Sequence, residues 1–143
     1  MVKQKASSSE HTDEICDTVK NEVFCKVFES IKRAKLICES LSTSKASAIE
    51  EYKNALRCRL EVQYASGLLR VNWVLDADPP ITRTRYGRDV CLGRIGQLLS
   101  ESLKSLESRK MESALDQLLS ADVLLGKVIG SMRREGKRGS SGI

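Results

Sequence analysis

The helical pattern of this chain is clearest in LGRIGQLLSESLKSLESRKMESALDQLLSADVLLGKVIGSM, residues Leu92 to Met132. Its apolar residues recur every three or four positions on both sides of the polar segment Ser108–Lys110, a spacing typical of amphipathic helices. A connection this short joins antiparallel neighbours. The stretch therefore predicts a C-terminal αα-hairpin, with helices over Arg88–Glu107 and Met111–Arg133.

The first half of the chain has the same apolar period. It predicts a helix over Thr12–Leu41, with Thr12 as its cap. A second helix follows the capping-box pair Ser47 and Glu50, or begins already at Ser44, and runs to Leu75. Asp78-Pro79-Pro80 then excludes helix, because residues before proline avoid the α region. The chain as a whole predicts an all-α, antiparallel four-helix bundle-like domain, with breaks near residues 42–46, 76–87 and 108–110.

The 143 residues suffice for one domain with a core of its own. We assign the helical bundle domain to residues 12–134, a flexible N-terminal segment to 1–11 and a basic flexible tail to 135–143. Hydrophobic residues make up 41% of the chain and aromatic ones only 4%, so we expect an aliphatic core.

The predicted hairpin carries small and aliphatic residues on both sides of its turn. These residues are Leu106, Ala114, Leu115, Leu118 and Ala121. In this respect the hairpin resembles those of tetratricopeptide-type and translin-type helical proteins. The chain has no repeat at a solenoid period, and we infer no function from the resemblance.

The helix predicted over residues 45–75 carries two apolar stripes. One consists of Ile49, Tyr52, Leu56, Leu60, Tyr64, Val71 and Val74, and the other of Ala55, Cys58, Val62, Ala65, Leu69 and Trp73. An ordinary surface helix has one apolar face, so this helix is either central in the fold or carries a second interface. We assign the interface, for a protein partner or for self-association, to Cys58, Val62, Ala65, Leu69 and Trp73.

A basic segment precedes the third helix. It offers three guanidinium groups and one aromatic ring, on Arg83, Arg85, Tyr86 and Arg88, and these groups suit a phosphate-bearing or acidic partner. The alternative is a solvated loop whose arginines pair with Asp76, Asp78 and Asp89. Arg133, Arg134, Lys137 and Arg138 follow near the C-terminus, and the net charge is +5. Nucleic acid is therefore the second partner class that we consider.

Asp122 interrupts the apolar stripe of the fourth predicted helix. A buried carboxylate is costly unless it is paired or hydrogen-bonded. Either Asp122 reaches water or Arg94 at the edge of the stripe, or it provides a specificity pair or binds a basic group of a partner.

No catalytic or metal-binding motif is present, and the single histidine, His11, has no recognisable partner pattern. The five cysteines form no CxxC pair, which favours small core residues in a reducing compartment. No apolar run approaches the ~18 residues of a membrane span, and the N-terminus lacks the apolar segment of a signal peptide. We therefore expect an intracellular protein of cytoplasm or nucleus, with no cofactor and no membrane partner.

We expect first a non-enzymatic helical-bundle interaction protein that acts as a subunit or adaptor of a larger assembly. The alternative is a small basic nucleic-acid-binding protein that uses the arginine loop at residues 82–88 and the basic tail.

Overall fold

The computed structural model describes the backbone of residues 2–43, 47–80 and 86–141, and the side chains of 18–43, 47–80 and 86–136. Within these ranges the regular structure is helical and contains no strand. The helices are α1 (Val2–Thr43), α2 (Ala48–Trp73), α3 (Arg88–Glu107) and α4 (Met111–Ser141). The predicted all-α fold, with breaks between the helices at the expected places, is confirmed.

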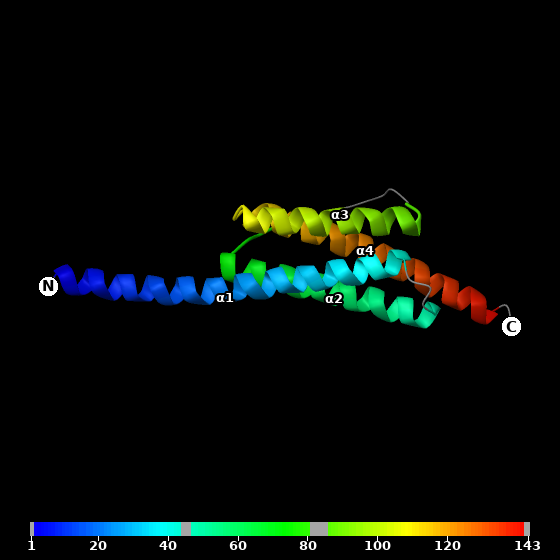
Figure 1. Cartoon of the computed structure of the whole chain (residues 1–143), viewed down its shortest axis with the longest axis horizontal. Helices are drawn as coiled ribbons and strands as arrows, with labels where there is room; N and C mark the ends of the chain where they lie inside the picture. Colours follow the sequence, from blue (N-terminus) through cyan, green and yellow to red (C-terminus); the bar gives the residue numbers. More distant parts are fainter. Residues whose placement is uncertain (1, 44–46, 81–85, 142–143) are drawn as a thin grey trace.

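Two predicted helix boundaries are wrong. α1 begins at Val2 rather than near Thr12, and α4 continues to Ser141 rather than ending near Arg133. The first eleven residues contain neither glycine nor proline, so nothing in them stops a helix. A glycine such as Gly136 costs a helix only about 1 kcal/mol relative to alanine, which weakens α4 without ending it. Figure 1 shows the two helices leaving the bundle at opposite ends.

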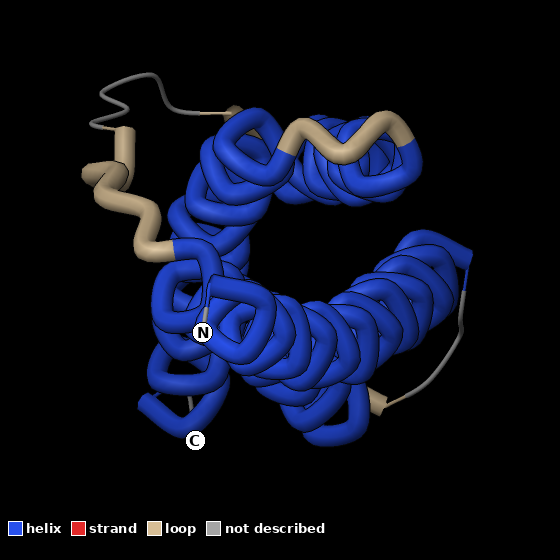
Figure 2. The backbone as a smooth tube through the Cα atoms, turned by 90° about the vertical axis from the view of Figure 1, so that its left-hand side faces the viewer, coloured by secondary structure: helices blue, strands red, loops and turns tan. Residues whose placement is uncertain are grey.

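The four helices follow the order α1, α2, α4, α3 around the bundle. α1 lies beside α2 and α3, and α4 lies beside the same two helices. In the described part of the chain no Cα atoms of a diagonal pair of helices lie within 8 Å of each other. Figures 1 and 2 show the hairpin of α1 and α2 as one layer and the hairpin of α3 and α4 as the other. Each helix is therefore antiparallel to both of its neighbours.

α2 ends and α3 begins at opposite ends of the bundle. Trp73, the last residue of α2, lies beside Arg109 and Met111 at the turn between α3 and α4. Arg88, the first residue of α3, lies beside Glu135 near the far end of α4. The connection between α2 and α3 is therefore a crossover along the bundle, a known variant of four-helix topology.

The core is aliphatic, as the composition predicted. Its largest fully buried side chains come from all four helices and include Ile31, Leu69, Ile95, Leu99, Leu115 and Leu125. The turn between α3 and α4 places Arg109 in the left-handed region, with φ 59°. There the Lys110 N–H donates to the Ser105 carbonyl at 2.8 Å, which closes α3 with a Schellman-type bond.

Candidate interaction surface

α2 is fixed in place by its own cap and by polar contacts on both edges. The Ser47 side chain accepts a hydrogen bond from the Glu50 N–H at 3.3 Å, so the predicted cap is confirmed. On the edge toward α1, Glu61 accepts hydrogen bonds from the Arg33 guanidinium and the buried Ser30 hydroxyl. Burial alone raises the pKa of the Glu61 carboxyl, but the two donors outweigh it and the pKa is lowered overall.

On the edge toward α4, Asp122 is the acceptor that joins the two helices. Its Oδ1 accepts from Arg59 Nε at 2.9 Å and from Gln63 Nε2 at 3.2 Å. Gly126 leaves room for this arginine, because a Cβ added there would lie 3.1 Å from Arg59 Nη2. The predicted contact with Arg94 is wrong, since Arg94 lies near Glu101 of its own helix at 4.0 Å. The spacing placed Asp122 at a helix seam but did not identify its partner.

The stripe of α2 that we predicted to be the interface lies in the core instead. Four of its members, Cys58, Val62, Ala65 and Leu69, have no exposed surface within the single chain. The fifth, Trp73, is half-buried and packs against the core cluster. The prediction that α2 is apolar on two sides was sound, but the stripe chosen as the interface was the wrong one.

The opposite stripe is exposed except at Leu56 and Tyr52. Tyr52 is half-buried against the core, and its hydroxyl accepts a hydrogen bond from Arg133 Nε at 2.8 Å. Ile49 is 68% exposed, Leu60 64%, Val71 77% and Val74 88%, and Tyr64 is about half exposed. Leu56, which lies between Ile49 and Leu60, is half-buried against the core. These six residues, Ile49, Leu56, Leu60, Tyr64, Val71 and Val74, form what we call the outer stripe. It runs along the whole of α2 on the side away from α1 and α4.

The outer stripe ends on a strained residue. Val74 caps α2 with φ 50° and ψ 52°, in the left-handed region that β-branched residues rarely occupy. Its N–H donates to the Arg70 carbonyl, and the Leu75 N–H donates to the same carbonyl at 3.2 Å. Glycine is the usual residue at such a position. The chain instead has an exposed valine there, which extends the apolar stripe past the end of the helix.

The predicted basic cluster is only partly placed. Arg83 and Arg85 lie outside the described residues. Tyr86 is half exposed and lines a hollow of about 340 Å³ with Pro80, Val90 and Leu124. Arg88 does not face solvent freely, because its Nη2 lies 2.5 Å from Glu135 Oε2 and its Nε is buried without a hydrogen-bond partner. The structure therefore assigns Arg88 to the contact between α3 and α4 rather than to a basic binding loop.

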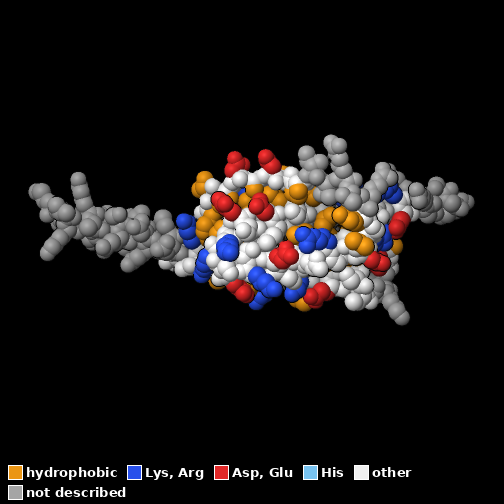
Figure 3. Space-filling view, turned by 90° about the horizontal axis from the view of Figure 1, so that it is seen from above, with side chains coloured by type: hydrophobic (Ala, Val, Ile, Leu, Met, Phe, Trp, Pro, Cys, Tyr) orange, Lys and Arg blue, Asp and Glu red, His pale blue; other side chains and the backbone are white. Residues whose placement is uncertain are grey.

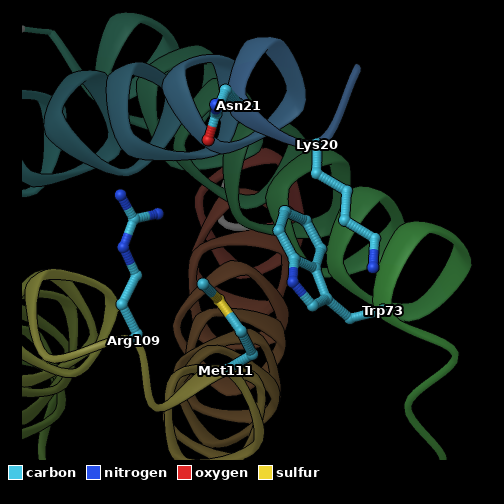
Figure 4. Close-up of a pocket in the computed structure, with 5 residues that line it drawn as sticks. All are labelled: Lys20, Asn21, Trp73, Arg109 and Met111. Atoms are coloured by element: carbon cyan, nitrogen blue, oxygen red, sulfur yellow. The ribbon is translucent and has the colours of Figure 1, made fainter. Parts of the chain in front are cut away.

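A second hollow opens where α1, α2 and the turn between α3 and α4 meet. It measures about 460 Å³ and is lined by Lys20, Asn21, Trp73, Arg109 and Met111 (Figure 4). The Arg109 guanidinium lies 4.0 Å from the centre of the Phe24 ring, a cation–π contact that holds the turn against α1. No sequence pattern predicts this hollow, because its residues come from three separate segments.

The face of the molecule shown in Figure 3 has no single dominant charge. On the face shown in Figure 3, basic and acidic side chains are interspersed over the helices. The described residues contain no group of three or more histidine, cysteine or acidic side chains able to hold a metal ion. None of the described helices has the length and apolar character needed to span a membrane.

The comparisons with known proteins assign no relative. The chain matches no family model, no curated protein and no solved structure.

Proposed function

We propose that this chain is a non-enzymatic helical-bundle protein that acts as a subunit or adaptor, and that it holds its partner on the outer stripe of α2. The observation that supports this most is that α2 is apolar on two opposite sides. Its inner stripe fills the core of the chain, while the outer stripe remains exposed.

Single exposed apolar residues are common and need no explanation. A row of five exposed apolar residues along one helix, interrupted at Lys53 and Gly67, is different, because removing it from water is worth about 25 cal/mol for each Å² buried. Contiguous apolar surface of this kind marks interaction sites in folded proteins. Docking of a helix along such a row, with anchors one or two turns apart, is a recurrent mode of recognition.

The strain at Val74 supports the same proposal. A left-handed backbone costs a residue with a Cβ about 1–2 kcal/mol, and a glycine would avoid this cost. With 88% of its surface exposed, Val74 recovers little of that cost inside its own chain. Contact with a partner gives the side chain a role that its own fold does not.

The proposal is tested with a photo-crosslinking amino acid placed at Leu60 in the full chain expressed in its native cells. A matched position is Asp116, which is exposed on α4. We expect covalent products from position 60 and none from position 116. If position 60 yields no product, or both positions yield the same products, the outer stripe is not the interaction surface.

Nucleic acid remains the second candidate, supported by the net charge of +5 and by the exposed Arg133 and Arg134 of α4. Each phosphate contact would add about one unit to the slope of log affinity against log salt concentration. Measuring binding of single-stranded and duplex oligonucleotides at two salt concentrations decides this alternative. Absence of binding at low salt rejects it.

A further inference from the structure

The outer stripe of α2 has a symmetric pattern about Leu60. Four residues to either side lie Leu56 and Tyr64, and eleven residues to either side lie Ile49 and Val71. Ile49, Leu60, Tyr64 and Val71 are exposed, and Leu56 is half-buried at the border between this face and the core. Positions four and eleven residues apart share a face of a helix. The apolar residues of the outer stripe before Leu60 are therefore matched by apolar residues at the same distances after Leu60.

The same symmetry pairs a large side chain with a small one. Seven residues before Leu60 is Lys53, and seven residues after it is Gly67. Both lie on the exposed side of α2, and a Cβ added at Gly67 would meet nothing within 4 Å. An antiparallel helix laid over this face would therefore find open space above Gly67 wide enough for a lysine stem.

We propose that the outer stripe is the interface of a symmetric dimer, with α2 of one copy antiparallel to α2 of a second copy and a two-fold axis through Leu60. In this pairing Ile49 faces Val71 of the second copy and Leu56 faces Tyr64 of the second copy. Lys53 crosses over Gly67 of the second copy, and the two Leu60 side chains meet on the axis. An interface of this kind must be complementary to itself, and the outer stripe fulfils this. The proposal names the partner for the interaction function proposed above and rests on it.

The charged residues on this face are compatible with self-association of two α2 helices that are antiparallel about Leu60. The two copies of Lys53 would lie about 21 Å apart along the helices at 1.5 Å per residue, well beyond the screening length of about 8 Å in physiological salt. Arg57 is exposed and forms no ion pair in the described part of the chain, and it lies one turn before Glu61 on the edge that faces α1. A two-fold axis of this orientation places the α1-facing edge of one α2 beside the α1-facing edge of the second α2. Arg57 therefore approaches Glu61 of the second copy.

The size of the face predicts a weak dimer. From Ile49 to Val71 the stripe is about 33 Å long, and a helix with side chains is about 10 Å wide. The pairing thus buries roughly 700 Å² over both copies, below the ~1,200–2,000 Å² of stable interfaces. We expect association that depends on concentration, with monomer at low micromolar and dimer at high micromolar concentration.

The first test is sedimentation equilibrium of the full chain with two matched variants. Leu60→Asp places two carboxylates together at the axis and should reduce the mass to that of the monomer. Leu36→Asp makes the same change on the outer side of α1, where Leu36 is 66% exposed and comparable to Leu60 at 64%. It should leave the mass unchanged. Circular dichroism is the control that checks whether both variants are folded.

The second test does not depend on a disruptive variant. In a Cys16→Ser, Cys25→Ser background, Leu60→Cys alone should form a disulfide-linked dimer under mild oxidation. Leu56→Cys alone should not, because its two copies lie about 12 Å apart along the axis at 1.5 Å per residue. Mixing the Leu56→Cys and Tyr64→Cys proteins should give the mixed dimer.

The dimer proposal is overturned if the wild type stays monomeric at several hundred micromolar. It is also overturned if Leu56→Cys crosslinks to itself as fast as Leu60→Cys does. The photo-crosslinking experiment at position 60 distinguishes failure of the dimer proposal from failure of the proposed interaction function. Products that contain another protein and no second copy uphold an interaction surface and reject self-association. Absence of any product rejects both.

Discussion

Val74 is the residue at which local backbone preference and surface chemistry conflict most clearly. Its left-handed conformation suits glycine, and its side chain is the most exposed of the large apolar residues in the described chain. Its contribution to the folded state is therefore mainly backbone strain. Its contribution to an interface is apolar surface.

We expect Val74→Gly to stabilise the isolated chain by about 0.5–1 kcal/mol, since relief of the left-handed strain exceeds the extra entropy that glycine loses on folding. Urea denaturation measured by circular dichroism at low protein concentration checks this. Val74→Ala is the control, because it keeps a Cβ and should bring no comparable gain. Equal stabilisation by both variants would contradict the assignment of strain to the backbone.

The buried thiols provide a second prediction for individual residues. Burial raises the pKa of Cys58 to about 12 and that of Cys38 to about 11, from an ordinary value near 9. Both groups bind their protons more tightly when folded, so their contribution to stability is complete below pH 9. It is lost as the pH rises toward 11 and 12.

The free energy of unfolding should therefore fall steeply between pH 9 and pH 11, and less steeply in a Cys38→Ala, Cys58→Ala variant. Denaturant titrations at a series of pH values measure both slopes. Parallel slopes for the wild type and the variant would show that the two thiols do not carry the effect.

Among the elements, α2 differs from the other helices because it is apolar on opposite sides. The sequence showed both stripes, since a period of three or four residues is visible without a structure. It did not show which stripe is buried, because that depends on where α1 and α4 pack. Cys58 and Ala65 are small enough to let these neighbours approach closely, and the outer stripe has no residue as small.

Two substitutions in α2 should separate its faces. Val62→Asp places an unpaired carboxylate in the core and should cost several kcal/mol, enough to unfold the domain. Leu60→Asp, two residues earlier, should change stability by about 0.5 kcal/mol or less, as is usual for exposed positions. Thermal unfolding of both proteins by circular dichroism is the measurement. A folded Val62→Asp protein would mean that the inner stripe is not the core.

For the whole molecule, the helix periods and the polar breaks predicted the four-helix architecture and the hairpin of α3 and α4. The crossover between α2 and α3 was not predictable, because a long connection is compatible with helices at either end of the bundle. The ends of α1 and α4 were misplaced because weak helix formers extend a helix that is already nucleated. The pairs Arg59–Asp122 and Arg88–Glu135 join distant segments and follow only from the packing.

In the proposed dimer, α2 buries its inner stripe in its own chain and its outer stripe in a second copy. The most direct test is the rate of thiol labelling of Leu60→Cys, in the Cys16→Ser, Cys25→Ser background, across protein concentrations. If this arrangement is right, we expect fast labelling at position 60 in dilute protein, progressive protection as the protein concentration rises, and no labelling of the buried Cys58 at any concentration. Labelling at position 60 that is equally fast at every concentration, or a reactive Cys58, would contradict it.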